Sequence, residues 1–206
     1  MIKKTLYPKT TRVKVSESKS CQLTEKIDGS NLCIIKKDET LYIAQRNNIY
    51  EISEIDNCKD IVYKGLYQWL MDHKDWLIEN LHNNSVLCGE WVGMGCLKYP
   101  TFEKKFYMFA KANITEEFEL KNIYYYHDLF KYPFINQEVP EFIGIVPVVD
   151  EISKIPTKAE LDEIYKDYCE KVNRAVEGIV VNYQNNVTKY VRMKNGKLQE
   201  HFDRGE

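Results

Sequence analysis

The segment of this chain that is most suited to chemistry lies between two predicted strands and reads Glu25-Lys26-Ile27-Asp28-Gly29-Ser30-Asn31. Its lysine is a potential nucleophile once the side-chain amine has lost its proton. With an ordinary pKa of about 10.4, that deprotonation costs roughly 4 kcal/mol near neutral pH, so a neighbouring cation would have to lower the cost. Asp28-Gly29 is also an ordinary hairpin turn signal. Taken alone, the segment favours a tight turn beside an exposed lysine.

A carboxylate in a later strand also stands out. In the predicted strand Val86–Val92, side-chain alternation puts Glu90 in line with Cys88 rather than with Leu87 and Trp91. A carboxylate that continues an apolar face is costly unless it is paired or functional. Glu90 is therefore a candidate for either an ion pair or a ligand contact.

Two cations close the chain's last predicted strand. Alternation puts Tyr190, Arg192 and Lys194 on one face and Val191 and Met193 on the other. The pattern predicts that the two cations point one way while the apolar residues point into a core. A solvated edge-strand face is the alternative.

The elements that must position these residues are mostly strands. Alternating or β-rich runs predict strands at Cys21–Glu25, Leu32–Lys36, Leu41–Gln45, Val86–Val92, Phe106–Ala110, Gly144–Val149, Ile179–Tyr183 and Thr188–Met193. Apolar residues at helical spacing predict one helix between Val62 and Leu81. A second helix is predicted to begin at Thr157, which forms a capping box with Glu160. The fold class is α+β, built from antiparallel strands with a few helices.

Composition limits the classes of protein that remain. The chain has 206 residues, of which 44% are hydrophobic, and this is enough apolar material for one globular unit. Its 29 Lys and Arg residues nearly balance its 31 Asp and Glu residues, so a contact with a polyanion needs a local basic surface. The six cysteines show no metal-ligand spacing and are predicted to be reduced thiols. No apolar run suits a membrane span, and we expect a soluble, cytoplasmic protein.

The candidate residues follow one another in the order of a known motif series, that of the covalent nucleotidyltransferases, which include polynucleotide ligases and mRNA capping enzymes. Lys26-Ile27-Asp28-Gly29 resembles the first motif, which carries the nucleophilic lysine. The segments that resemble the later motifs are Ala44-Gln45-Arg46-Asn47, Leu87-Cys88-Gly89-Glu90-Trp91, Phe106-Tyr107-Met108-Phe109, Val176-Glu177-Gly178-Ile179-Val180-Val181 and Val191-Arg192-Met193-Lys194-Asn195. Five ordered matches after the first outweigh the simple turn interpretation.

Within that superfamily the chain resembles the nick-sealing, double-strand type of ATP-dependent RNA ligase. Ser30-Asn31 and the closing stretch Arg192-Met193-Lys194-Asn195-Gly196-Lys197 carry this finer resemblance, which runs from about Cys21 to Lys197. It implies one nucleotidyltransferase domain over residues 1–206, with an ATP-grasp-like ligase fold. In that fold, two antiparallel sheets enclose a nucleotide pocket and helices flank them.

The resemblance also implies a role for each candidate residue, with ATP and Mg²⁺ or Mn²⁺ as cofactors. The implied catalytic residues are Lys26, Glu177, Arg192 and Lys194, and the implied ATP-binding residues are Glu25, Asn31, Arg46, Glu90 and Phe109. Glu90 would contact the ribose, Glu177 would hold the metal, and Phe109 would stack on the base, a contact typically worth about 1–3 kcal/mol. As alternatives, both glutamates would be structural ion-pair partners and Phe109 a core residue.

The chain departs from the family pattern at two positions. Relatives usually carry an acidic residue directly after the stacking phenylalanine, whereas Ala110 and Lys111 follow Phe109 here. If the family pattern applied unchanged, Ala110→Asp would tighten ATP binding. Relatives of this branch also tend to have lysine where Arg192 stands, and a guanidinium is not a geometric substitute for an ammonium.

The sequence says least about how the protein would bind a polynucleotide. Because 12 residues follow Lys194, we expect neither a C-terminal oligonucleotide-binding domain nor a helical one. RNA ends or a nicked duplex would then be held by local lysines or by a partner chain that adds RNA-binding surface. The lysines considered are Lys36, Lys37, Lys98, Lys104 and Lys105.

Four functions compete. In the favoured one, an RNA ligase, Lys26 takes AMP from ATP and passes it to an RNA 5′-phosphate, and the activated end is joined to a 3′-hydroxyl. A capping-type guanylyltransferase and a DNA ligase are the enzyme alternatives, and both are disfavoured by the expected lack of a further domain. A non-catalytic module that binds RNA ends is the alternative from another class.

Overall fold

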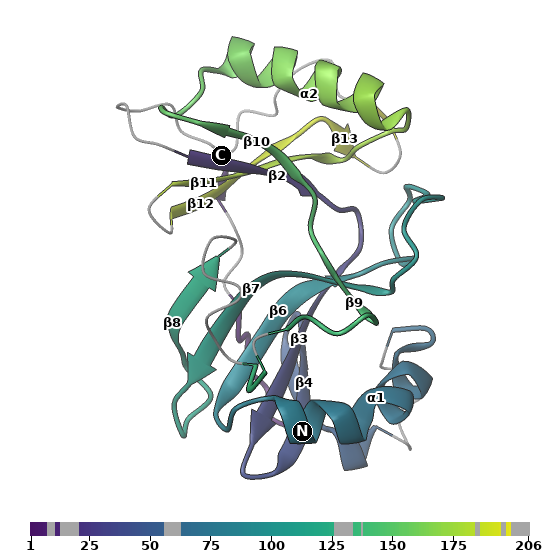
Figure 1. Ribbon diagram of the computed structural model, residues 1–206, viewed down its shortest axis with the longest axis vertical. Helices are drawn as coiled ribbons and strands as arrows, with labels where there is room; N and C mark the ends of the chain where they lie inside the picture. Colours follow the sequence, from purple (N-terminus) through teal and green to yellow (C-terminus); the bar gives the residue numbers. More distant parts are fainter. Residues whose placement is uncertain are drawn as a thin grey trace. The chain divides into compact units, whose positions relative to one another are not determined.

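The computed structural model describes residues 1–7, 11–12, 21–55, 63–125, 134–136, 138–183, 186–194 and 197–198. The chain divides into two compact units, which are described separately (Figure 1). Unit 1 comprises Met1–Pro8, Gly29–Met94 and Lys104–Ile145. Unit 2 comprises Lys9–Asp28, Gly95–Glu103 and Val146–Glu206.

Unit 1 is built on a seven-stranded sheet in the order β5-β4-β3-β6-β7-β8, with β9 also paired to β7. Its strands are β3 (Ser30–Lys37), β4 (Thr40–Gln45), β5 (Asn48–Glu51), β6 (Ser85–Trp91), β7 (Phe106–Ile114), β8 (Leu120–Tyr125) and β9 (Ile143–Ile145). All of these pairs are antiparallel except β7 with β9. A short 3-10 helix, η1 (Ile52–Glu54), follows β5.

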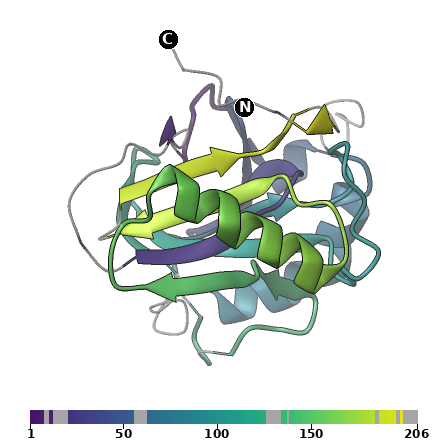
Figure 2. The same cartoon turned by 90° about the horizontal axis from the view of Figure 1, so that it is seen from above.

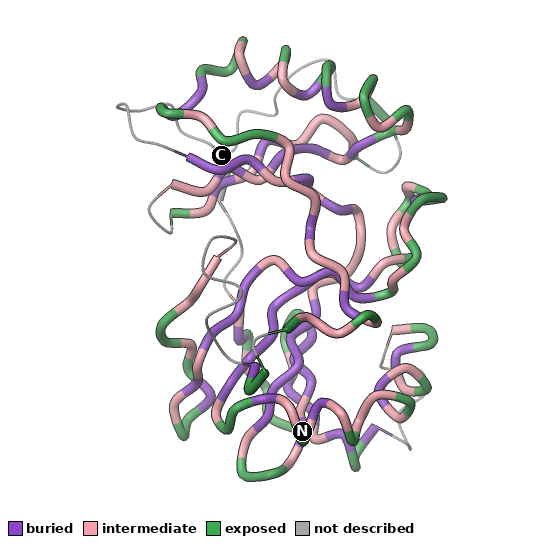
Figure 3. Tube along the Cα trace, in the orientation of Figure 1, coloured by how far each residue is buried: buried purple, intermediate pink, exposed green. Residues whose placement is uncertain are grey.

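The sheet of unit 1 is buried on both faces, as strand alternation in β3 makes clear. Leu32 and Ile34 belong to one core cluster, and Cys33 and Ile35 belong to another. Helix α1 (Leu66–Asn80) covers the first cluster with an apolar stripe of Leu66, Leu70 and Leu77. Figure 3 shows the buried central strands of this unit beside the mixed burial of α1.

A β-bulge interrupts the pairing of β6 with β7. Cys88 pairs with Ala110 and the next residue, Gly89, pairs with Met108, so Phe109 is an extra residue in β7 without a partner in β6. The bulge also reverses which side chains of β7 face which cluster. Phe106 and Met108 belong to the cluster under α1, whereas Ala110 belongs to the other. Bulges commonly re-aim a side chain next to a functional site.

Unit 2 is built on a five-stranded sheet in the order β1-β12-β11-β2-β10. Its strands are β1 (Thr11–Arg12), β2 (Cys21–Lys26), β10 (Val148–Ile152), β11 (Gly178–Tyr183) and β12 (Asn186–Val191). Two further short strands, β13 (Met193–Lys194) and β14 (Lys197–Leu198), pair with each other. Helix α2 (Lys158–Val172) lies across one face of the five-stranded sheet (Figure 2).

Helix α2 begins and ends at residues that suit those positions. The hydroxyl of Thr157 accepts a hydrogen bond from the main-chain N–H of Glu160, whose side chain in turn accepts one from the Thr157 N–H. The capping box predicted from the sequence is therefore confirmed. At the other end, Asn173 has a φ of 50° and a left-handed conformation that stops the helix. Leu161, Tyr165 and Tyr168 are buried against the sheet.

The predicted α+β class with mostly antiparallel sheets and two helices is confirmed. The predicted strand Gly144–Val149 is instead two strands, β9 and β10, which pair with different sheets. The first helix begins at Leu66, and Val62, where the sequence pattern starts, lies outside the described residues. Strand β8 was not predicted. None of the helices in the described part of the chain has the length and apolar character needed to span a membrane.

Candidate active site

In unit 2, Lys26 and Glu177 come together at the end of β2. Lys26 pairs with Gly178 in the antiparallel ladder of β2 with β11, and Glu177 directly precedes that glycine. The Nζ atom of Lys26 lies 2.6 Å from Oε2 of Glu177, and the two side chains are 22% and 16% exposed. Burial raises the pKa of the Glu177 carboxyl above its ordinary value, and the Lys26 ammonium partly offsets this rise. The predicted nucleophile is thus accessible and paired.

Two glycines of the motif series are required by close approaches of the main chain. A Cβ atom at Gly178 would lie 2.0 Å from the carbonyl oxygen of Tyr190 on the neighbouring strand. In unit 1, a Cβ atom at Gly29 would lie 2.5 Å from the carbonyl oxygen of Trp91 and 2.8 Å from Cγ of Glu90. No side chain fits at either position, so both motif segments are constrained by packing.

Asp28 does more than form a turn. Its Oδ2 atom accepts hydrogen bonds from the main-chain N–H groups of Cys96, at 2.6 Å, and Leu97, at 2.8 Å. Its own N–H donates to the hydroxyl of Tyr99 at 2.5 Å. The segment that contains Cys96 is therefore attached to the chain two residues after the nucleophile. Sequence reasoning had not assigned a function to this segment.

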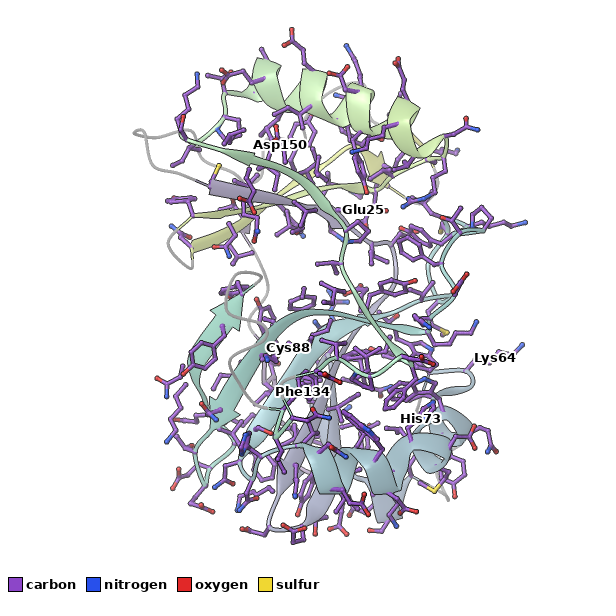
Figure 4. All side chains as sticks on the ribbon, viewed as in Figure 1. Glu25, Lys64, His73, Cys88, Phe134 and Asp150 are labelled. Carbon is purple, nitrogen blue, oxygen red and sulfur yellow. The ribbon has the colours of Figure 1, made fainter. Side chains whose placement is uncertain are left out.

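The carboxylate of Glu25 is occupied by other protein groups. Arg174 donates from Nη1 to Oε1 and from Nη2 to Oε2, each at 2.6 Å, and the hydroxyl of Tyr168 donates to Oε2 at 2.8 Å. The side chain of Glu25 is 0% exposed, and Figure 4 labels it beside α2. Lys26, the next residue of β2, points to the opposite face. The predicted ATP-binding role of Glu25 stays a prediction, and its carboxylate is not beside Lys26.

Arg192 contacts helix α2 in the structure. Arg192 shares a face with Tyr190 as predicted, but that face is the one covered by α2, with Tyr190 completely buried. Nη1 of Arg192 lies 3.1 Å from Oδ1 of Asp162 on α2. Lys194 is exposed in β13. The expectation that the cationic face lies away from the core therefore fails for Arg192, because α2 packs on it, and the catalytic roles of both residues stay predictions.

Lys189 is a cation that sequence reasoning missed. It lies on β12 between Thr188 and Tyr190, which are buried toward α2, so alternation places it on the face that carries Lys26. Its charge lowers the pKa of Glu177 and so partly opposes the effect of burial. The available signal was the alternation of β12 itself, which puts Lys189 on the face opposite to Tyr190.

In unit 1, the predicted ATP-binding residues share one region of the sheet. Asn31 and Glu90 are direct partners in the ladder of β3 with β6. The hydroxyl of Tyr63 donates to the carbonyl oxygen of Asn31 at 2.9 Å. Burial raises the pKa of Tyr63 to about 12, the charge of Glu90 adds to the rise, and the charge of Arg46 opposes it. Arg46 and Glu90 therefore both lie within electrostatic range of Tyr63.

Phe109, the bulged residue of β7, is partly buried on the same sheet face as Cys88. Its ring meets that of Tyr7 edge to face, with the centroids 5.1 Å apart. Tyr7 in turn shares a hydrogen bond of 2.9 Å with the hydroxyl of Tyr125. Alternation in β6 places Glu90 on that face as well. Phe109 is therefore a partly exposed aromatic ring on the same sheet face as a predicted ribose contact.

Ala110 is enclosed rather than open to a ligand. It is 0% exposed and pairs with Cys88 on one side and Tyr125 on the other. A carboxylate in this apolar cluster would be desolvated. The expectation that Ala110→Asp would tighten ATP binding is therefore replaced by an expected loss of stability.

A metal could be held at this site by few protein groups. The described residues contain no group of three or more His, Cys, Asp or Glu side chains suited to a metal ion. Glu177 is a single, partly exposed carboxylate. Mg²⁺ commonly takes one or two carboxylates and completes its shell with phosphate oxygens and water. Glu177 could therefore supply one ligand to an ion that also binds phosphate oxygens and water. It could not form a metal site with protein ligands alone.

The comparison with protein families decides the affiliation of the chain. The family model described as RNA ligase matches residues 19–195, which include every predicted site residue. The chain belongs to the RNA ligase family. The search of curated proteins found no match. The assignment to the nick-sealing branch of this RNA ligase family stays a prediction.

Solved structures show the same fold at low sequence identity. A mutant of the Naegleria gruberi RNA ligase in its apo form is 18% identical, with a TM-score of 0.53, and the match covers 84% of this chain and 49% of that one. An archaeal ATP-dependent RNA ligase is 15% identical, with a TM-score of 0.51, and the match covers 90% and 48% of the two chains. Another Naegleria gruberi RNA ligase mutant, solved with ATP and Mn, is 17% identical, with a TM-score of 0.51, over 85% and 50%. This chain therefore spans about half the length of each of those proteins.

Proposed function

We propose that the protein is an ATP-dependent RNA ligase that forms a covalent lysyl-AMP intermediate on Lys26. The observation that carries the proposal is the contact of 2.6 Å between Lys26 Nζ and Glu177 Oε2, and both residues lie in the part of the chain that matches the RNA ligase family. Nζ attacks the α-phosphorus of ATP, a P–N bond forms, and the bond to pyrophosphate breaks. AMP then passes to an RNA 5′-phosphate, and a 3′-hydroxyl displaces AMP from the activated end.

The proton of the Lys26 ammonium has a defined acceptor in this proposal. Glu177 Oε2 already holds Nζ by a hydrogen bond, and burial makes its carboxyl more basic than an ordinary glutamate. The same hydrogen bond orients the amine, and the charge of Lys189 acts on the same carboxylate. Lys26 can therefore be aligned before ATP arrives, and the loss of its proton needs no large movement.

We propose that the residues of unit 1 bind the nucleoside. Asn31 and Glu90, as cross-strand neighbours, would hydrogen-bond the ribose. The partly exposed ring of Phe109 would stack on the base. Arg46, which is exposed in the turn between β4 and β5, would contact a phosphate or the ribose. Arg192 and Lys194 remain proposed phosphate contacts, and Arg192 would have to leave Asp162 to make one.

Mg²⁺ or Mn²⁺ is the proposed second cofactor. Glu177 would hold the ion together with phosphate oxygens and water. When bound, such an ion polarises the phosphate and stabilises the charge that develops on the leaving group. The role of the protein is to supply the carboxylate beside Lys26.

The finer assignments rest on the motif details. We propose RNA ends or nicked duplexes as substrates, a single nucleotidyltransferase domain that comprises both units, and a cytoplasmic location. A partner chain that adds RNA-binding surface is compatible with this proposal. DNA ligation is the second candidate, because a putative ATP-dependent DNA ligase from Aquifex aeolicus has a TM-score of 0.50 with this chain, at 16% identity, over 90% of this chain and 49% of that one.

The test is labelling of the protein with radioactive ATP or GTP and a divalent metal, followed by denaturing gel electrophoresis. We expect an acid-labile adduct from ATP and none from GTP. A GTP-specific adduct would point to a capping enzyme, and no adduct with either nucleotide would point to a binding module. Matched nicked duplexes with RNA or DNA on both sides of the nick then separate the two ligase activities.

A further inference from the structure

The main chain on both sides of Lys26 is held by one connected set of side chains in unit 2. Glu25, on one side, is bound by Arg174, whose side chain is 8% exposed. Asp28, on the other side, is bound by Tyr99 and by the segment that follows Gly95. These contacts involve neither ATP nor the amine of Lys26. They instead hold the strand end that carries it.

Arg174 connects the two sides. Its guanidinium carbon lies 5.0 Å from the ring centroid of Tyr99 and 4.8 Å from that of Phe102. The two rings are themselves stacked, with centroids 4.6 Å apart and an interplanar angle of 20°. The guanidinium therefore contacts an aromatic surface while its two terminal nitrogens bind Glu25. Through Tyr99, the same group is linked to the main chain of Asp28.

The short connection from α2 to β11 makes two ion pairs with consecutive residues of β2. Arg174 pairs with Glu25 and Glu177 pairs with Lys26, each at 2.6 Å. Arg174 and Glu177 carry opposite charges, as do Glu25 and Lys26, so each charged residue of the connection pairs with an opposite charge on β2. Asn173, in the left-handed conformation, ends α2 directly before Arg174 and so sets the start of this connection. A shift of the connection along β2 would disturb both pairs together.

We propose that Arg174 is a positioning residue that aligns Lys26 with Glu177, by fixing the connection that carries Glu177 and the strand end that carries Lys26. This inference rests on the proposed function and extends it to residues outside the motif series. Arg174 does not touch the amine, so its effect reaches the reaction through Glu25 and Glu177. Loss of the bidentate pair leaves the Lys26 amine less well aligned, and adenylylation slows while ATP binding is retained.

The test compares single-turnover adenylylation rates and ATP affinities of the parent protein with those of two variants. Arg174→Met leaves Glu25 as a buried unpaired charge, which endangers folding. The double variant Glu25→Gln/Arg174→Met removes both charges together and avoids that problem. We expect the double variant to form the adduct at least tenfold more slowly at saturating ATP. Arg174→Lys should recover only part of the rate, because an ammonium cannot reproduce the bidentate fork.

Thr157→Ala is the matched control. It removes the hydroxyl that caps α2, so it weakens the same helix at the end opposite to Arg174. We expect its labelling rate to stay within twofold of the parent. An equal loss of rate in Thr157→Ala and in the double variant would show a general effect of α2 stability and would overturn the proposal. So would a double variant that labels within twofold of the parent.

A second measurement needs no enzymatic activity. Acylation of Lys26 by an N-hydroxysuccinimide ester, followed by peptide mass spectrometry, reports how firmly Glu177 holds the amine in ATP-free protein. We expect at least a threefold faster modification in the double variant, relative to the exposed Lys166 as internal reference. An unchanged rate would overturn the positioning role. If the parent protein forms no adduct, the proposed function fails, and this measurement still decides whether Arg174 aligns Lys26.

Discussion

Lys26 in unit 2 and Lys111 in unit 1 are both strand lysines, yet the structure gives them opposite surroundings. Lys26 is 22% exposed and hydrogen-bonded to Glu177. Lys111 is 0% exposed, its Nζ has no hydrogen-bond partner among the described residues, and the ring centroid of Phe134 is 4.8 Å away. Burial lowers the pKa of Lys111 from 10.5 to about 7.

This difference shows that a lowered pKa alone does not make a lysine usable as a nucleophile. Lys111 loses its proton more easily than an ordinary lysine, but it is enclosed by the apolar cluster under α1 and cannot meet a phosphate. Lys26 is reachable and lies beside a carboxylate that can take its proton. Access and a neighbouring acceptor, rather than a low pKa alone, therefore distinguish the proposed catalytic lysine from the structural one.

The largest expected effect comes from replacing the two lysines in turn. Lys26→Ala should abolish the AMP adduct, and Lys26→Arg should do so as well, because a guanidinium does not lose its proton in this pH range. Lys111→Met should leave labelling within about threefold of the parent. Gel labelling with radioactive ATP measures all three. Full labelling of either Lys26 variant would mean that the nucleophile is another residue.

Glu177 should be nearly as important as Lys26. Glu177→Ala removes the hydrogen-bond acceptor of Lys26 and the proposed metal ligand, and we expect at least a hundredfold slower labelling, equivalent to about 3 kcal/mol. Glu177→Gln keeps the shape but not the charge, so it should be similarly slow. Single-turnover labelling at saturating ATP and metal checks both variants. A fully active Glu177→Gln enzyme would contradict the proton-acceptor and metal roles.

Ala110→Asp should destabilise unit 1. It would place a carboxylate at a position that is 0% exposed, within an apolar cluster, and we expect a loss of about 3 kcal/mol in the free energy of unfolding. Ala110→Asn, with the same shape and no charge, should lose less. Chemical denaturation of both variants at pH 7.5 gives the comparison. Parent-like stability together with tighter ATP binding would restore the family interpretation of this position.

The smallest expected effect concerns the stability of the protein around Lys111. Its folded-state pKa of about 7 lies below its value of 10.5 in the unfolded chain, so between these values the unfolded state binds more protons. The contribution of Lys111 to stability therefore rises with pH through this window and is weakest below it. We expect Lys111→Met to stabilise the protein at pH 6 by about 1–3 kcal/mol.

Denaturation curves of the parent and Lys111→Met at pH 6 and pH 9 measure this effect. The advantage of the variant should shrink as the pH rises, because the parent then buries a neutral amine. Lys26→Met is the matched control, since Lys26 is partly exposed and already paired. An advantage of Lys111→Met that is the same at both pH values would mean that Lys111 stays protonated in the folded protein up to pH 9.

Local patterns predicted the elements of this fold better than they predicted contacts. The start of α2 was predicted because a capping box involves residues three positions apart. Strand β7 continues to Ile114, four residues beyond the predicted end at Ala110. The prediction that Arg192 and Tyr190 share one face of their strand was also correct. Which face of that strand is covered depends on the packing of α2, and this packing leaves no mark in the strand itself.

The site could be predicted from the sequence only through the order of the motifs. Lys26 and Glu177 are 151 residues apart, and no periodicity or composition connects them; only the resemblance to nucleotidyltransferases did so. The pair of Glu25 with Arg174 spans 149 residues and lies outside the motif series. Neither local spacing nor the motifs indicated it. Contacts of this kind emerge only when the sheet and α2 are assembled.

Locating the AMP group on the protein tests directly whether Lys26 is the nucleophile. The parent protein would be incubated with ATP and magnesium, digested, and analysed by tandem mass spectrometry under conditions that preserve the phosphoramidate bond. We expect AMP on Lys26 and on no other lysine. AMP on Lys111 or on any other residue, with Lys26 unmodified, would contradict this expectation.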